Sequence, residues 1–160
     1  MSELRIGLGV DAHALGPGVK LVLGGVELDH PTGLAGHSDG DVIAHALIDA
    51  VLGAANRGDI GTLFPSGAET PQGISSLDLL RDVYELVRGD GWELVNADCV
   101  LVGQAPRIGP HRDEMAARLA AAMGVDAARV AVRATTTDHL GFTGREEGLA
   151  AQAVALLQRV

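Results

Sequence analysis

Apolar residues cluster in one long stretch and several shorter ones, and their spacing predicts the secondary structure. From Val42 to Ala55 the chain is apolar almost all the way round a helix, which predicts a buried helix. Ser38 is placed to cap the N-terminus of this helix, with Asp41 three residues further on. Residues Leu4 to Val10 form a short apolar run with two glycines, which predicts a buried strand that continues into Asp11-Ala12-His13.

The rest of the chain alternates between strands and helices. Gly24-Gly25 indicates the turn of a hairpin, and Gly16-Pro17-Gly18 breaks the chain before it. The remaining elements are expected as follows: hairpin strands over Lys20–Leu23 and Val26–Leu28, helices over Ser76–Arg88, between Pro110 and Gly124, and over Glu146–Gln158, strands over Trp92–Val102 and Val130–Thr135, and loops over Thr62–Ser75 and Thr136–Gly144. Together they predict an α/β fold, an α+β sandwich in which helices pack on one face of a mixed β-sheet.

Length, charge and cysteine content narrow the class of protein. The chain has 160 residues, which indicates a single domain over residues 1–160. Its formal net charge of −9, without a basic run, argues against nucleic acid or an anionic membrane as a partner. Cys99 is the only cysteine, so no internal disulfide is expected. Because we find no signal peptide and no apolar run long enough to span a bilayer, we expect a cytoplasmic protein.

Two ionisable side chains interrupt the apolar surface of the predicted 42–55 helix. His45 and Asp49 are four residues apart and therefore lie on one face, where burial is costly unless they are paired or bind a metal. If the first strand continues through His13, then Asp11 and His13 point to the same side of it. Asp11, His13 and His45 would then supply one carboxylate and two imidazoles, a donor set typical of catalytic zinc. The alternative is a solvated Asp11, a surface His13 and a hydrogen-bonded core His45.

Two further segments carry polar groups suited to phosphate or cations. The run Thr135-Thr136-Thr137-Asp138 follows a strand, so its hydroxyls could donate to phosphate oxygens and its carboxylate could hold a hard cation. Equally, threonine is favoured in strands and Asp138 could cap a turn. Arg145, before the last predicted helix, could bind phosphate or simply pair with a neighbouring glutamate. His37 could donate to a phosphoryl oxygen or be an ordinary loop histidine.

Taken together, these residues match one family. From about Arg5 to the C-terminus the sequence resembles the 2-C-methyl-D-erythritol 2,4-cyclodiphosphate synthases of non-mevalonate isoprenoid biosynthesis. The motifs that carry the resemblance are IGLGVDAH, GGVEL, AGHSDGDVIAHALIDAVLGAANRGDIGTLFP, QAPRIGPH and ATTTDHLGFTGREEG. The resemblance implies a phosphorus–oxygen lyase that converts 4-diphosphocytidyl-2-C-methyl-D-erythritol 2-phosphate to the cyclic diphosphate and releases CMP.

The resemblance also implies roles for individual residues. Asp11, His13 and His45 match the family's zinc ligands, and Asp138 matches the ligand of a second divalent cation, Mg²⁺ or Mn²⁺. His37 and Thr136 match positions that stabilise the transition state. The matching substrate-binding positions are Ser38, Asp59, Ile60, Gly61 and Phe64, the cytidine pocket Gly103, Ala105, Pro106, Arg107, Ile108 and Gly109, and then Thr135, Thr136, Thr137, Phe142 and Arg145. Of these, Asp59, Ile60 and Gly61 match contacts to the methylerythritol unit.

Assembly is a further implication of the resemblance. Family members are homotrimers with active sites between neighbouring subunits, and Arg145 matches a position near the threefold axis. If such a trimer encloses a central cavity for an isoprenoid diphosphate, Val10 makes that cavity wider and less aromatic. The chain departs from the family at further points, since Leu15, like Val10, replaces an aromatic residue seen in many members. Asp138 stands where the family often has Glu, and the segment Phe64-Pro65-Ser66-Gly67-Ala68 lacks a common acidic residue.

Two other functions remain open on the residues alone. The Asp11, His13 and His45 set by itself fits a metal-dependent phosphoester hydrolase. The small size and apolar helices fit a non-enzymatic binding protein for isoprenoid phosphates.

Overall fold

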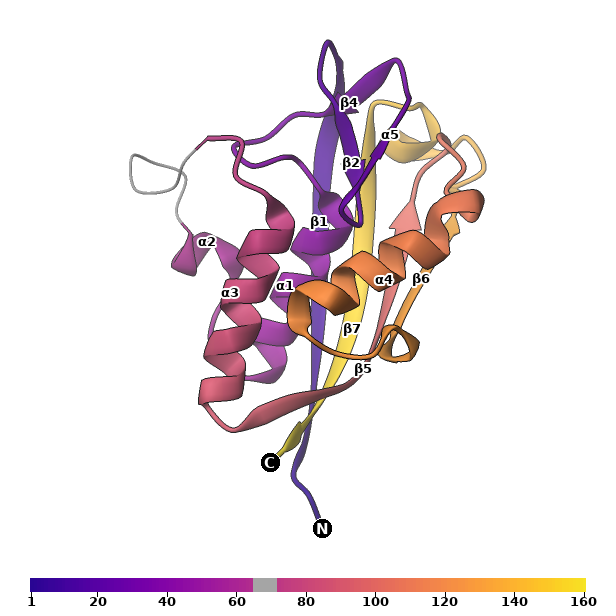
Figure 1. The fold of residues 1–160 in the computed structure, drawn as a ribbon. Coiled ribbons are helices and arrows are strands. Elements are labelled where there is room, and N and C mark those ends of the chain that lie inside the picture. Colours follow the sequence, from indigo (N-terminus) through magenta and orange to yellow (C-terminus); the bar gives the residue numbers. More distant parts are fainter. Residues whose placement is uncertain (65–71) are drawn as a thin grey trace.

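The computed structural model describes residues 1–64 and 72–160 and is built around a five-stranded mixed sheet (Figure 1). The strands lie in the order β4 (Thr32–Leu34), β1 (Leu4–Pro17), β7 (Gly148–Arg159), β5 (Trp92–Val102) and β6 (Val130–Thr135). Neighbouring strands are antiparallel except β5 and β6, which are parallel. A separate antiparallel hairpin consists of β2 (Leu21–Leu23) and β3 (Val26–Leu28), as the sequence predicted.

Three longer helices cover one face of this sheet (Figure 1). The helix α1 (Val42–Ala54) packs on β1 and β7, α3 (Ser76–Gly89) packs beside α1, and α4 (Arg112–Met123) lies over β6. The short helices are α2 (Ile60–Leu63) and α5 (Gly141–Gly144), and the 3₁₀ turns are η1 (Gly109–His111) and η2 (Ala127–Arg129). The predicted mixed sheet with helices on one face is therefore confirmed. Among the described residues, no helix has the length and apolar character needed to cross a membrane.

Two glycines in β1 allow α1 to lie directly on the sheet. A Cβ atom at Gly7 would lie 1.9 Å from the carbonyl oxygen of Ala50, and one at Gly9 would lie 1.8 Å from that of Ala46. Such short distances are impossible for real atoms, so only glycine permits this approach. As a result, α1 sits close against β1, just before Asp11 along the strand.

The opposite side of β1 carries an exposed apolar surface. Along the strand the glycines face α1, whereas Ile6, Leu8 and Val10 point away from it and are 73%, 63% and 56% exposed. Val154 of β7 pairs with Leu8 and is also exposed. We call Ile6, Leu8, Val10 and Val154 the apolar sheet face. Its extent is unusual for an isolated soluble chain and indicates a contact surface.

The prediction of a final helix over Glu146–Gln158 is wrong, because this segment forms β7, the central strand of the sheet. Ala151, Ala153 and Ala155 are buried, and the residues between them face the other side. Alanine and leucine favour helices in isolation. Here the segment pairs with β1 on one side and β5 on the other, so pairing within the sheet overrides local propensity.

The predicted cap of α1 is also wrong. Asp41, and not Ser38, caps this helix, because its carboxylate accepts the N–H of Ala44. The same buried carboxylate accepts the N–H groups of Gly24 and Gly25 in the hairpin turn. Asp41 therefore ties the β2–β3 hairpin to the start of α1.

Smaller differences concern element ends. The first strand extends to Pro17, beyond its predicted end, and Ser75 rather than Ser76 is the N-cap of α3. The predicted 62–75 loop begins inside α2, and its residues 65–71 lie outside the described residues, as does most of the Phe64–Ala68 segment. The predicted 136–144 loop ends in α5.

Candidate active site

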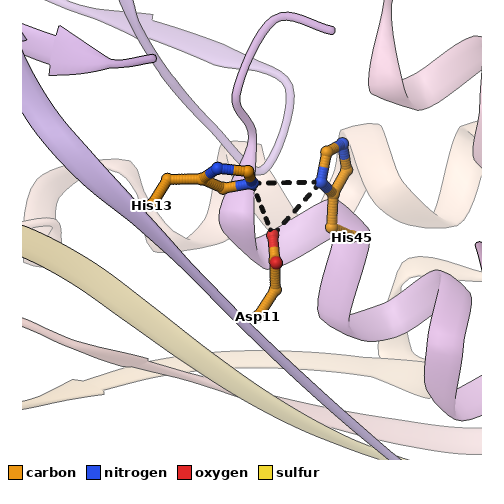
Figure 2. A group of neighbouring side chains, drawn as sticks. All are labelled: Asp11, His13 and His45. Carbon is orange, nitrogen blue, oxygen red and sulfur yellow. Dashed lines mark hydrogen bonds and ion pairs between the residues drawn. The ribbon is translucent and has the colours of Figure 1, made fainter. Parts of the chain in front are cut away.

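Asp11, His13 and His45 converge where β1 passes the N-terminal part of α1 (Figure 2). Asp11 and His13 are two residues apart on β1, on the side that faces α1, and His45 belongs to α1. The Oδ2 atom of Asp11 lies 2.8 Å from Nε2 of His13 and 3.1 Å from Nδ1 of His45. The two ring nitrogens are 3.4 Å apart.

The geometry and chemistry of this trio fit a zinc ion. A tetrahedral zinc with ligand bonds near 2.0 Å holds neighbouring donor atoms about 3.3 Å apart. The observed separations of 2.8, 3.1 and 3.4 Å lie close to that value. One carboxylate and two imidazoles are also the donor types of catalytic zinc, with the fourth position left to water or substrate.

The pKa values of Asp11 and His13 are shifted in the directions expected of a site that attracts positive charge. Burial acts to raise the pKa of Asp11, but hydrogen bonds from His13 and His45 outweigh it and lower this pKa to about 2. The hydrogen bond to Asp11 raises the pKa of His13 above its ordinary value of 6.5, although burial opposes the shift. A metal ion would replace these protons, because a ligating imidazole nitrogen must be unprotonated.

The second ring nitrogen of His45 is also held. Its Nε2 atom lies 2.9 Å from the hydroxyl oxygen of Ser38 and 2.9 Å from that of Ser76. Ser38 comes from the segment before α1, whereas Ser76 is the first residue of α3. Contacts to the non-ligating nitrogen orient a metal-binding imidazole.

A cavity of about 210 Å³ opens beside the trio. Besides the trio, its walls carry predicted site residues and two apolar side chains, namely His37, Ser38, Ile60, Gly61, Phe64, Ile74 and Leu79. Asp49 accepts the N–H of Ile60 at 2.8 Å and so fixes α2 against α1. Burial raises the pKa of Asp49. Asp59 caps α2 by accepting the N–H and hydroxyl of Thr62, each at 2.8 Å.

A second cavity, of about 400 Å³, lies at the end of β5 and β6. Its lining includes most of the predicted cytidine pocket and the first threonines, namely Gly103, Gln104, Pro106, Arg107, Ile108, Gly109, Pro110, Arg112, Ala134, Thr135 and Thr136. Since β7 and β5 separate β1 from β6, and strands lie about 4.8 Å apart, β6 is about 14 Å from β1 across the sheet. His37 and Thr136 therefore line different cavities of one chain.

Among the described residues, several other predicted site residues do not contact Asp11, His13 or His45. Asp138 is exposed, and its backbone N–H donates to the hydroxyl of Thr136. Thr137 donates its hydroxyl to the carbonyl of Leu140, within the same loop. Phe142 lines a third cavity, of about 310 Å³, which His13 also borders.

Arg145 does not precede a long helix, because the predicted helix is β7. It forms an ion pair with Glu147 at 3.0 Å, which is the alternative that the sequence left open.

Sequence reasoning missed the contacts of Ser76 and Asp39. Ser76 was predicted only as the start of a helix, and Asp39 was not singled out, yet Ser76 contacts His45 and Asp39 contacts Ser76. The only signal was a polar residue at the start of a predicted helix, which is ordinary. Ile74 and Leu79 of the cavity wall had no signal beyond their apolar character.

The α+β fold places a carboxylate–imidazole trio that could hold a metal ion beside a cavity, which is an arrangement found in metal-dependent enzymes. More particularly, the chain belongs to the YgbB family, whose sequence model matches residues 4–158.

Relatives with assigned names agree with this family. A 2-C-methyl-D-erythritol 2,4-cyclodiphosphate synthase of Moorella thermoacetica is 54% identical over 96% of this chain and 94% of its own. One of Rubrobacter xylanophilus is also 54% identical, over 99% of this chain and 98% of its own. The family resemblance stated from the motifs is thus confirmed.

Solved structures extend the comparison to the fold. A Plasmodium falciparum IspF in complex with CDP has a TM-score of 0.86 at 30% identity and covers 99% of this chain and 98% of its own. The bifunctional IspDF of Campylobacter jejuni has a TM-score of 0.96 at 40% identity. It covers all of this chain, which spans 43% of the bifunctional one.

Proposed function

We propose that the chain converts 4-diphosphocytidyl-2-C-methyl-D-erythritol 2-phosphate to 2-C-methyl-D-erythritol 2,4-cyclodiphosphate and CMP. The observation that carries the proposal is the convergence of Asp11, His13 and His45 beside a cavity. It occurs in a chain that matches named synthases along nearly its whole length. The activity is that of a phosphorus–oxygen lyase.

Asp11, His13 and His45 are assigned to zinc. A bound divalent cation supplies electrostatic stabilisation of phosphoryl oxygens and offsets the repulsion between the two anionic groups that must meet. We assign a second divalent ion, Mg²⁺ or Mn²⁺, to Asp138. The exposure of that carboxylate on a loop next to the second cavity is compatible with this role.

The reaction needs positioning more than proton transfer. An oxygen of the 2-phosphate attacks the β-phosphorus and forms the new P–O bond. The bond from the β-phosphorus to the bridging oxygen breaks, and CMP leaves with that oxygen and its electron pair. The attacking phosphate is already ionised near neutral pH, so no general base is required. His37, Ser38 and Thr136 are assigned to hold phosphoryl oxygens in line.

The second cavity is assigned to the nucleotide. Segment 103–109 lines it together with Thr135 and Thr136, and its backbone groups can hydrogen-bond a base. The CDP complex of the Plasmodium falciparum relative supports a cytidine nucleotide as the ligand. Ile60 and Gly61, on the first cavity, and Asp59, the cap of α2, are assigned to the methylerythritol unit.

We further propose a homotrimer whose active sites lie between subunits. Two observations support it. The trio and the 103–109 segment line separate cavities of one chain, so a complete site needs a neighbour's second cavity. The apolar sheet face needs a cover, and a symmetric assembly provides one. Val10 lies on this face, where a central cavity would take an isoprenoid diphosphate.

Incubation of the purified protein with the cytidylyl substrate and zinc, followed by ³¹P NMR, tests the activity. We expect CMP and the cyclic diphosphate to appear in equal amounts. Linear products or free phosphate would overturn the proposal and favour a hydrolase, for which ¹⁸O from solvent would enter the product. Binding of the substrate without turnover would favour a non-enzymatic binding protein.

A further inference from the structure

A fully buried hydroxyl holds the non-ligating nitrogen of His45. The side chain of Ser76 has no exposed surface, and its Oγ lies 2.9 Å from His45 Nε2. Ser38 Oγ lies at the same distance, but Ser38 lines the cavity and is partly exposed. His45 therefore has one neighbour that faces substrate space and one that is sealed inside the protein.

Asp39 fixes the orientation of Ser76. Its Oδ2 accepts the backbone N–H of Ser76 at 3.0 Å, and its Oδ1 accepts the Ser76 hydroxyl at 2.5 Å. Asp39 itself is held because its N–H donates to the carbonyl of Ile74. Both carboxylate oxygens thus face the first residue of α3, where Ser75, the formal N-cap, makes no side-chain capping bond.

These contacts allow only one arrangement of protons. Because the Ser76 hydroxyl donates to Asp39, its oxygen can only accept from His45, and so Nε2 must carry the proton. The neutral ring then has its lone pair on Nδ1, which is the atom that faces Asp11 and His13 (Figure 2). Asp39 and Ser76 together select the ring form that can bind a metal.

We infer that Asp39 and Ser76 are positioning residues for the metal centre, acting through His45 and touching neither metal nor substrate. The inference rests on the metal site of the proposed function and adds how that site is kept ready. When Ser38 turns to a phosphate, Ser76 keeps the orientation of His45 unchanged. The start of α3, which also borders the cavity through Leu79, is thereby joined to the site.

Asp39→Asn is the sharpest variant, because it keeps the shape of the side chain and replaces one of its two acceptor oxygens with a donor. Asp39 accepts from three donors, namely the hydroxyl and N–H of Ser76 and the N–H of Asp41, whereas Asn offers one acceptor oxygen. If the amide NH₂ faces the Ser76 N–H, Ser76 loses the bond that holds its backbone and is pushed away from its place beside His45. If the NH₂ faces the Ser76 hydroxyl, that hydroxyl donates to His45 Nε2, and the ring proton moves to Nδ1, where it blocks the metal. Ser76→Ala removes the acceptor without reversing it. Asp126→Asn, at an exposed carboxylate that caps η2, is the matched control.

The first measurement is zinc affinity by competition with a chelator, in the purified full chain without substrate. We expect Asp39→Asn and Ser76→Ala to lose about 10- to 100-fold in affinity, and Asp126→Asn to match the wild type. The second is the ring N–H signal of His45 in zinc-loaded protein with ¹⁵N-labelled histidine. This signal should be protected from solvent exchange in the wild type and shifted or lost in both variants. Circular dichroism of the zinc-free proteins establishes that they fold.

The outcomes separate the inference from the proposed function. Wild-type zinc affinity and an unchanged His45 signal in folded Asp39→Asn and Ser76→Ala would overturn the inference and leave the metal site intact. If one of the two variants does not fold, the other variant decides the test. In the wild type alone, free exchange of the His45 ring proton with solvent would also overturn the inference. A wild-type chain that binds no zinc would overturn both the inference and the metal site.

Discussion

The chemistry of the candidate site depends on single protons at Asp11 and His13. Asp11 gives up its proton at low pH, with a pKa of about 2, and His13 retains one above its ordinary range because Asp11 accepts from it. Zinc must displace the proton of His13 to bind, and so the site has a built-in competition between the metal and protons.

Zinc affinity should therefore rise with pH. As pH increases through the raised pKa of His13, the imidazole loses its proton and becomes a ligand, and each further unit of acidity below that pKa should weaken binding by up to about tenfold per displaced proton. Chelator competition across neutral pH measures this dependence. Affinity that does not change with pH would contradict a site in which protons and zinc share the same atoms.

The stability of the zinc-free protein should have the opposite dependence. The raised pKa of His13 adds stability that is complete below 6.5 and is lost as pH rises through the raised value. The lowered pKa of Asp11 adds stability above 3.8 that is lost as pH falls through about 2. The melting temperature of zinc-free protein should fall relative to His13→Gln as pH rises through the raised pKa of His13. A constant difference between the two proteins would contradict the Asp11–His13 pair.

At the scale of residues, the sequence predicted the metal-ligating side chains but not the residues that orient them. Asp11, His13 and His45 could be predicted because a carboxylate and imidazoles in apolar surroundings need a partner. Ser76 and Asp39 could not, because a serine or an aspartate near the start of a predicted helix is ordinary there and does not by itself require a partner. Only the folded chain brings the start of α3 to His45.

At the scale of elements, the packing of α1 on β1 sets the position of His45 relative to Asp11. The strand, the buried helix and the β5–α4–β6 unit followed from apolar periodicity and turn residues. The central strand β7 did not, because its alanines and leucines have high helix propensity, and only pairing on both edges makes it a strand. Its alternation of buried and exposed residues becomes visible only in the structure, because the outward positions include the apolar Val154 as well as Gln152.

Gly9→Ala should weaken both the fold and the metal site. A Cβ atom there would overlap the carbonyl oxygen of Ala46, so α1 must move away from β1. We expect the free energy of unfolding to fall by about 1–3 kcal/mol, and zinc affinity to fall with it. Gly16→Ala is the control, since nothing lies within 4 Å of its added Cβ. Urea denaturation of both variants measures the effect, and equal stability would contradict the close packing.

At the scale of the whole molecule, the apolar sheet face and the two separate cavities point to the same assembly. Ile6, Leu8, Val10 and Val154 form a surface that no described helix covers. The trio lies entirely within one chain, whereas in the proposed trimer the nucleotide cavity that completes the site comes from a neighbour. If the proposed trimer dissociates into single chains, metal binding should therefore persist while turnover is lost.

Leu8→Asp should separate these two properties. A charge on the apolar sheet face should convert the proposed trimer to monomers in light scattering and abolish CMP release, while zinc binding persists. Leu86→Asp, at an exposed leucine of α3 on the helical side, should stay trimeric and active. A monomeric Leu8→Asp variant with full activity would contradict active sites shared between subunits.

The central claim is that one metal, held by Asp11, His13 and His45, is required for the release of CMP. The most direct test measures zinc content and CMP release together in the wild type, His45→Ala and the loop control His30→Ala. We predict about one zinc per chain in the wild type and in His30→Ala, and loss of both zinc and activity in His45→Ala. Full turnover by a His45→Ala protein that holds no zinc would contradict the account.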